Sequence, residues 1–136
     1  MARIMAIDYG KKRTGIAVTD SLQIIATGLT TIDSHELIPF LKNYFVSDPV
    51  ELIIIGLPVN WDESDTHGTA PAKNAIERIR KAFPDMPLKT VDERFTSKMA
   101  KTAMVDMGMK KKDRQVKANV DVIAATIILQ EYMSNA

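Results

Sequence analysis

The chain begins with short apolar segments that are separated by polar turns. Residues 3–8 form an apolar run that ends in an acid, and residues 14–19 form a second run after the polar turn at 9–12. Short runs of this kind, bounded by turn residues, are typical of β-strands. Residues 22–31 predict a third strand, which is interrupted by Gly28. We therefore expect three consecutive antiparallel strands at the start of the fold.

The spacing of apolar residues then becomes helical. Residues 36–45 predict a helix, with Ser34 as its N-cap. The continuous apolar run at 52–55 predicts a central strand that is covered on both faces. A helix over 71–82 and a short strand over 88–91 follow. Strands and helices thus alternate in this half of the chain.

Two more helices are predicted near the end, over 96–107 and 115–133, and the polar residues 59–70 predict a loop. The expected fold class is α/β, with three antiparallel strands followed by alternating β and α elements. This order predicts a mixed five-stranded sheet with helices on both faces. Residues 1–136 are expected to form a single domain, since the length suits one.

Composition narrows the chemistry. The chain has no cysteine, which excludes disulfides and thiolate metal sites. Its two histidines are too few for a histidine-rich metal site. A metal would have to be held by carboxylates, which favours Mg²⁺ or Mn²⁺. The N-terminal apolar run is too short for a signal peptide, and no segment approaches the length of a membrane span. We therefore expect a cytoplasmic protein without a membrane partner.

Three acids stand where an α/β fold delivers side chains to a common site. Asp8 ends the first predicted strand, Glu93 lies just past the strand over 88–91, and Asp121 lies in the last predicted helix. Ligands of open α/β sheets gather beyond the strand ends. Carboxylates from several elements can hold two divalent cations about 4 Å apart, which activate a water and stabilise the leaving oxygen of a phosphodiester. The acids therefore predict a metal-dependent hydrolase.

Each acid also has a purely structural interpretation. Asp8 could form an Asx-type turn. Glu93 could pair with Arg94 or cap the helix that follows it. Asp121 could pair with Lys117, four residues earlier. Any one of these interpretations is as good as a metal role, but three such coincidences are less expected than one metal site.

Several residues near the acids are candidates for contact with a substrate phosphate. The predicted substrate-binding residues are Gly10, Lys11, Arg13, Arg94 and Thr96. On the predicted hairpin, a phosphate contact is favoured more strongly for Arg13 than for Lys11. Arg94 could equally form an ion pair that orients Asp92, and a helix N-cap is the default role for Thr96.

Four motifs in this order resemble the YqgF family, also called RuvX, which comprises pre-16S rRNA nucleases and proteins similar to Holliday junction resolvases. The motifs are IDYGKKRTGIAVTD at 7–20, IIGLP at 54–58, VDERFTS at 91–97 and VDVIAATIILQ at 120–130. The resemblance covers nearly the whole chain. It implies an RNase H-like fold related to RuvC resolvases and processing of the 5′ end of precursor 16S rRNA.

The resemblance also implies a site. The acids of the family motifs fall on Asp8, on Glu93 or its neighbour Asp92, and on Asp121. These three positions are the expected catalytic residues, and all four acids are candidate metal ligands. The loop after residues 54–58 departs from the commoner family pattern, which affects expected substrate contacts in that loop but not the acids.

Three alternatives stay open on the sequence. The substrate could be a DNA junction, in which case a dimer is needed to make two cuts. With an RNA substrate, the chain could be either a monomer or a homodimer. A non-catalytic module that binds nucleic acid or the ribosome would suit residues 94–117, where eight Lys or Arg stand against two Asp. That segment could also be a plain solvated surface, and the net charge of +1 argues against tight unspecific binding of RNA.

Overall fold

The structure is a computed structural model that describes residues 2–57, 69–92 and 117–134. Five strands form one sheet in the order β3-β2-β1-β4-β5. Their bounds are β1 Arg3–Tyr9, β2 Arg13–Thr19, β3 Ala26–Asp33, β4 Val50–Leu57 and β5 Leu88–Asp92. All five strands were predicted from the spacing of apolar residues.

Strand directions bring several chain segments to one end of this sheet. β1 pairs antiparallel with β2, and β2 pairs antiparallel with β3. β1 pairs parallel with β4, and β4 pairs parallel with β5. The predicted mixed sheet is therefore confirmed. The ends of β1, β3, β4 and β5 and the start of β2 all meet at what we call the Asp8 end of the sheet.

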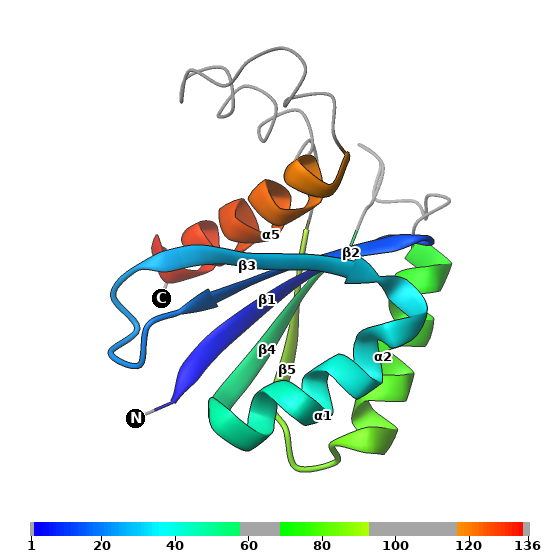
Figure 1. Ribbon diagram of the computed structural model, residues 1–136, viewed down its shortest axis with the longest axis horizontal. Coiled ribbons are helices and arrows are strands. Elements are labelled where there is room, and N and C mark those ends of the chain that lie inside the picture. Colours follow the sequence, from blue (N-terminus) through cyan, green and yellow to red (C-terminus); the bar gives the residue numbers. More distant parts are fainter. Residues whose placement is uncertain (1, 58–68, 93–116, 135–136) are drawn as a thin grey trace.

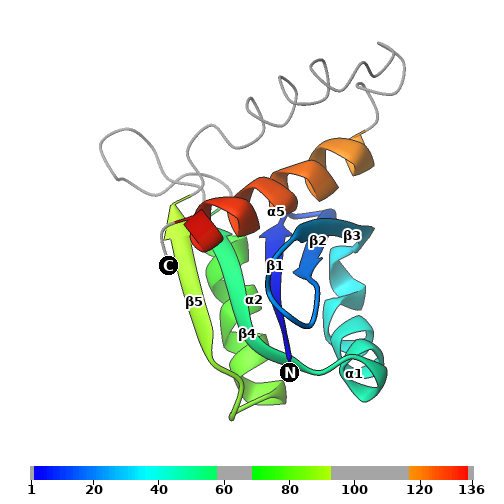
Figure 2. The same cartoon turned by 90° about the vertical axis from the view of Figure 1, so that its left-hand side faces the viewer.

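Helices cover both faces of the sheet, as the sequence predicted (Figure 1). The short 3₁₀ helix η1, Ser34–Glu36, leads into α1, Leu37–Ser47. Figure 2 shows α1 and α2, Thr69–Ala82, on one side of the sheet and α5, Lys117–Ser134, on the other. None of the helices in the described ranges combines the length and the apolar character of a membrane span.

Alternation along β1 decides which face Asp8 occupies. Met5 and Ile7 are fully buried in the core that contains residues of α1 and α2. Ala6 belongs to the other core, together with Leu129 of α5. Because successive side chains of a strand point to opposite faces, Asp8 shares the face of Ala6. Asp8 therefore lies on the side of the sheet that α5 covers.

α5 packs unusually close to the sheet because small residues line the contact. A methyl group placed on Gly15 of β2 would overlap the backbone carbonyl of Asp121. A methyl group on Gly28 of β3 would lie 2.5 Å from a side-chain carbon of the same helix. On the helix side, Ala124 and Ala125 are fully buried. These two alanines, three and four residues after Asp121, thus allow the close approach.

The structure corrects the prediction for Ser34. It is not the N-cap of the following helix, since η1 begins at Ser34 and α1 begins only at Leu37. The Ser34 side chain is buried, and its hydroxyl donates to the carbonyl of Gly10 at 2.6 Å. It also lies 2.8 Å from the hydroxyl of Thr14. Partners that are distant in sequence have replaced the local capping bond.

The predicted third strand began too early. The structure places residues 22–25 in a turn, and β3 starts at Ala26. The reason is the Asp20 carboxylate, which accepts hydrogen bonds from backbone N–H groups in this turn. Gln23 within the turn has a positive φ of 59°. Apolar residues in the segment resembled a strand, but local hydrogen bonds to an acid determine its shape.

The second helix begins two residues before the predicted start, at Thr69. The predicted helix over 96–107 and most of the predicted loop at 59–70 lie outside the described residues. The predicted last helix is confirmed as α5, Lys117–Ser134, while residues 115 and 116 lie outside the described residues.

Candidate active site at the Asp8 end of the sheet

Two of the predicted acids come together although they stand far apart in the sequence. Asp8 of β1 is the direct cross-strand partner of Gly15 in β2. The backbone of Asp121 in α5 lies against this same glycine, on the face that Asp8 shares. Both acids are half-buried. The close packing of α5 on Gly15 is therefore what brings Asp121 to the Asp8 end of the sheet.

Arg13 joins this pair of acids. Its Nε lies 3.4 Å from Oδ2 of Asp121, across a sequence separation of 108 residues. The Arg13 side chain is 36% exposed and that of Asp121 is 25% exposed. An ion pair with this much solvent contact is worth about 1 kcal/mol or less. Such a contact can hold the two side chains together, but a stronger partner of either side chain can displace it.

The turn between β1 and β2 presents the other predicted phosphate contacts. The N–H of Gly10 donates to the carbonyl of Arg13 at 2.9 Å, which closes the turn. A methyl group on Gly10 would lie 2.5 Å from that carbonyl oxygen. Lys11 and Lys12 at the tip are exposed. A glycine is therefore needed here for the tight closure, and Lys11 extends into solvent.

η1 fixes this turn from the outside. The N–H of Ser34 donates to the carbonyl of Lys12 at 2.9 Å, in addition to its hydroxyl contact with Gly10. Two hydrogen bonds from one residue thus hold both sides of the turn.

Tyr9, the residue after Asp8, is held from the other face of the sheet. Nη2 of Arg78 in α2 donates to the Tyr9 hydroxyl at 2.7 Å, and Tyr9 is almost fully buried. This contact anchors the end of β1 directly beside the acid. The sequence analysis missed it, although a buried tyrosine regularly needs a partner for its hydroxyl.

The remaining predicted site residues are placed only in part. Asp92 ends β5 and pairs with Leu57 of β4, so its backbone lies at the Asp8 end of the sheet. Glu93, Arg94 and Thr96 lie outside the described residues. Their predicted roles therefore stay predictions.

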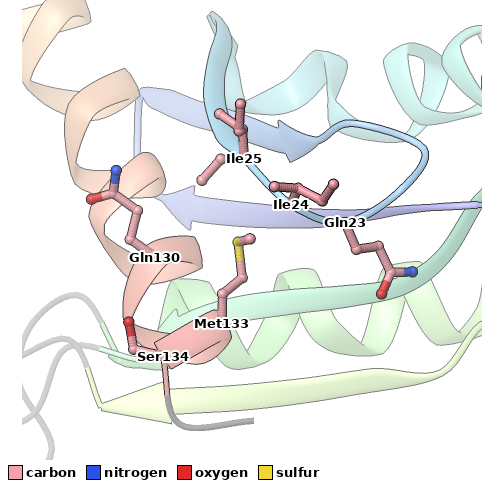
Figure 3. A pocket seen from close by; sticks show the side chains of 7 residues that line it. Gln23, Ile24, Ile25, Gln130, Met133 and Ser134 are labelled. Atoms are coloured by element: carbon pink, nitrogen blue, oxygen red, sulfur yellow. The ribbon is translucent and has the colours of Figure 1, made fainter.

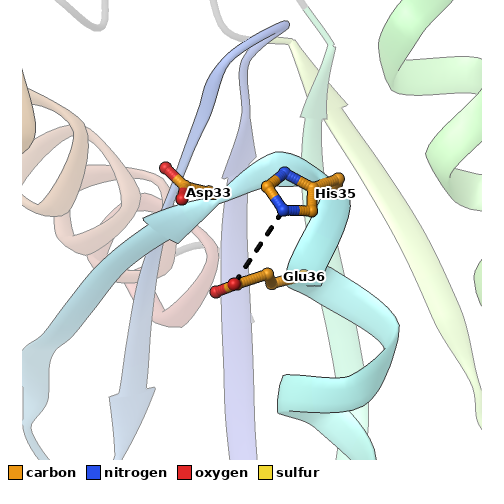
Figure 4. Close-up of side chains that lie close together, drawn as sticks. All are labelled: Asp33, His35 and Glu36. Atoms are coloured by element: carbon orange, nitrogen blue, oxygen red, sulfur yellow. Dashed lines mark ion pairs between the residues drawn. The ribbon is translucent and has the colours of Figure 1, made fainter.

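Another group of possible metal ligands lies at the junction of β3 and η1. Asp33, His35 and Glu36 each have one ligand atom within 4.8 Å of the others, and all three are exposed (Figure 4). Nε2 of His35 lies 3.9 Å from Oε1 of Glu36. The sequence analysis did not predict this group. Its members come from one local segment, so it is an ordinary acidic surface rather than a site assembled by the fold.

A pocket of about 490 Å³ lies at the other end of the sheet, between α5 and the turn before β3 (Figure 3). It is lined by Gln23, Ile24, Ile25, Ala26, Gln130, Met133 and Ser134. None of these seven side chains is a carboxylate, an imidazole or an amine, so the lining offers neither an acid–base group nor a charged ligand for a divalent cation.

Sequence comparison places the chain in a family. Residues 2–135 match the family described as RuvX: Holliday junction resolvase. A relative from Phocaeicola vulgatus is 53% identical over 99% of this chain and 97% of its own length. One from Bacteroides thetaiotaomicron is 52% identical over 99% of this chain and 98% of its own length. Both carry the name "Putative pre-16S rRNA nuclease".

Structural comparison identifies the fold. The RuvC of Thermus thermophilus in complex with a Holliday junction substrate matches with a TM-score of 0.59 and 13% identity, over 99% of this chain and 96% of that chain. Another Thermus thermophilus RuvC structure matches with a TM-score of 0.54 and 12% identity, over 97% and 96%. Sequence identities this low show a common fold and nothing more. The fold of this chain is RNase H-like. With the family match over nearly all residues, this chain belongs to the RuvX family.

Proposed function

We propose that this protein is a metal-dependent nuclease that hydrolyses phosphodiester bonds of RNA during 5′-end maturation of precursor 16S rRNA. The observation that carries the proposal is the placement of Asp8 and Asp121 at one end of the sheet, through the contact of α5 with Gly15. The names of the Phocaeicola and Bacteroides relatives support the choice of RNA.

The donor set suits a hard divalent cation. Carboxylates from a strand and a helix supply oxygen ligands, which Mg²⁺ and Mn²⁺ prefer. Asp8 and Asp121 would hold the ion, together with Asp92 at the end of β5 or its sequence neighbour Glu93. When bound, such ions activate a water and stabilise charge on the phosphate and on the leaving oxygen. A half-buried acid next to another acid also gains from a cation, because like charges repel.

Basic and polar side chains of the chain would position the nucleic acid. Lys11 is exposed at the tip of the closed turn, where a phosphate can reach it. Arg13 lies beside Asp121 and can make two parallel bonds to a phosphate. Gly10 lets the backbone of the turn come close to the phosphate. From the sequence we add Arg94 and Thr96 as contacts next to Glu93.

The site depends on the whole chain. Asp8 belongs to the first strand and Asp121 to the last helix, so neither half of the chain contains both. We therefore propose that residues 1–136 act as one nuclease domain. With this role in the processing of precursor rRNA, we also propose a cytoplasmic location for the protein.

The test is cleavage of a short RNA that spans the mature 5′ end of 16S rRNA, with Mn²⁺ as the probe metal. Asp8→Asn is expected to reduce the rate by more than about 100-fold, since even the groups that support metal ligands contribute 10- to 100-fold. Binding of the RNA, measured by fluorescence anisotropy, should persist.

Asp85→Asn is the matched control, because it removes an exposed carboxylate from the turn between α2 and β5, at the opposite end of the sheet. It should cleave at the wild-type rate. Binding without cleavage by the wild type would instead indicate a non-catalytic RNA-binding module. A resolvase would be indicated if the protein cleaved a four-way DNA junction in preference to RNA and sedimented as a dimer.

A further inference from the structure

Arg13 contacts one acid, and the register of the sheet places the backbones of two further acids at neighbouring positions. It lies on the α5 face of β2, in alternation with Gly15 and Ala17, and contacts Asp121 of α5. The register of the sheet places Asp33 of β3 directly opposite Arg13. Asp8 lies on the diagonal, because its direct partner is Gly15, two residues further along β2.

A divalent cation and the Arg13 guanidinium would compete for the same carboxylate. Both carry positive charge, so a metal bound to Asp121 would repel the guanidinium that lies 3.4 Å from Oδ2. Arg13 is 36% exposed, and its long side chain can therefore turn away from α5 without breaking a core contact. A phosphate would be an equally good partner for the released guanidinium.

We propose that Arg13 is a positioning residue that exchanges Asp121 for the substrate phosphate when a divalent metal binds. The proposal rests on the proposed nuclease function. Without metal, Arg13 neutralises Asp121 and holds it in place. With metal, the guanidinium is free for the phosphate, and a phosphate that captures it leaves Asp121 open to metal. Metal and phosphate therefore strengthen each other's binding, since linkage of this kind is reciprocal.

The experiment measures Mn²⁺ binding to the full chain without nucleic acid, from the electron paramagnetic resonance signal of free Mn²⁺. Arg13→Gln is expected to bind Mn²⁺ about three- to tenfold more tightly than the wild type, because the competing charge is gone. Arg80→Gln is the matched control, since it removes the same charge from an exposed ion pair with Glu77 in α2. It should bind Mn²⁺ like the wild type.

Two additions separate charge from shape and test the exchange. Arg13→Lys keeps the positive charge that competes with the metal, and it should therefore bind Mn²⁺ with the wild-type affinity. Millimolar dimethyl phosphate, a phosphodiester anion that is too stable to be cleaved in the assay, should tighten Mn²⁺ binding to the wild type. The same addition should leave Arg13→Gln nearly unchanged, because the phosphate has lost its partner.

The outcomes distinguish this inference from the function on which it rests. If Arg13→Gln binds Mn²⁺ no more tightly than Arg80→Gln, or if Arg13→Lys matches Arg13→Gln, the exchange is overturned while the nuclease proposal stands. If the wild type and all variants fail to bind Mn²⁺, the metal-dependent function itself is overturned, and the exchange with it.

Discussion

Two aspartates at opposite ends of the sheet are stabilised in contrasting ways. Asp20, in the turn before β3, accepts three hydrogen bonds from backbone N–H groups within residues 22–25, at 2.8 to 3.1 Å. These partners lie no more than five residues away in the sequence. Asp121 pairs with Arg13, which is 108 residues away. One acid shapes a local turn, and the other is brought to its partner by the fold.

The difference helps to separate structural acids from candidate functional ones. The hydrogen bonds of Asp20 account for its presence, because they form the turn that joins β2 to β3. The Arg13 contact does not account for Asp121 in the same way, since a partly exposed ion pair contributes little to stability. Asp121 also requires the close packing of α5 on Gly15, which constrains two elements. A position that the fold maintains for so little stability is a good candidate for function.

The largest expected effect is on cleavage by the two corresponding variants. Asp121→Asn should lower Mn²⁺-dependent RNA cleavage by more than about 100-fold, as expected for a metal ligand. Asp20→Asn should stay within about twofold of the wild type, because its turn lies at the far end of the sheet. Rates under single-turnover conditions measure both variants.

Thermal unfolding of the same variants checks that the lost cleavage activity comes from the missing carboxylate and not from unfolding of the protein. Asp121→Asn should change the free energy of unfolding by no more than about 1 kcal/mol, the worth of its ion pair with Arg13. An Asp121→Asn protein that is unfolded at room temperature would mean that this acid is structural, and the contrast with Asp20 would disappear.

The next effect concerns the glycine that places Asp121. Gly15→Ala should cost about 1–3 kcal/mol of stability, because the added methyl group meets the backbone of α5, which cannot turn aside. The helix should shift outward and carry Asp121 away from Asp8, so cleavage should fall as well. Urea unfolding and the cleavage rate measure the two consequences.

Gly28→Ala is the matched control for this change. Its methyl group would meet mainly the Cγ1 atom of Val122, a side-chain carbon rather than backbone. The stability loss should therefore be smaller, and cleavage should be nearly retained. Equal losses of activity in both variants would show that general loosening of α5, rather than the position of Asp121, limits the reaction.

Periodicity predicted most of the fold because buried strands need continuous or alternating apolar residues. The failures share one cause, which is a polar side chain whose hydrogen bonds cannot be read from the spacing of apolar residues. Ser34 resembled an N-cap, yet it bonds to the turn after β1. Residues 22–25 resembled a strand, yet Asp20 folds them into a turn.

The candidate site was predictable as a set of acids with nearby phosphate-binding candidates, but the contacts among these residues were not. The positions of Asp8 and Asp121 followed from strand ends and from small residues on the last helix. Nothing in the residue pattern indicated that Arg13 contacts Asp121 or that Arg78 anchors Tyr9. Ion pairs and hydrogen bonds over such separations depend on the register of the sheet, which a single sequence does not specify.

A smaller effect is expected for the residue that fixes the turn beside Asp8. Ser34→Ala should cost about 1–2 kcal/mol, because it leaves the buried hydroxyl of Thr14 and the carbonyl of Gly10 without their partner. The loosened turn should also weaken RNA binding through Lys11. Ser47→Ala removes an exposed hydroxyl as a control and should change neither quantity. If both variants behave alike in urea unfolding and in anisotropy, Ser34 does not support the turn.

The smallest effect is a pH dependence at the other end of the sheet. The backbone N–H of Ile25 does most to lower the pKa of Asp20 below its ordinary value of 3.8, against a smaller rise from desolvation. The N–H groups of Ile24 and Leu22 lower the pKa further. Since the pKa is lower in the folded state, the carboxylate stabilises the fold fully above pH 3.8. This stabilisation is lost as the pH falls through the pKa of the folded state.

Asp20→Asn should therefore weaken the dependence of stability on pH below about 4, while its cleavage at neutral pH stays normal. Urea unfolding at pH 5 and pH 3 measures the change. Asp85→Asn, which removes an exposed carboxylate from the turn between α2 and β5, is the control and should leave the wild-type dependence in place. If Asp20→Asn keeps that dependence too, the charge on Asp20 does not hold the turn. The amide oxygen of asparagine would then serve the backbone N–H groups equally well, and the contrast with Asp121 would rest on hydrogen bonding alone.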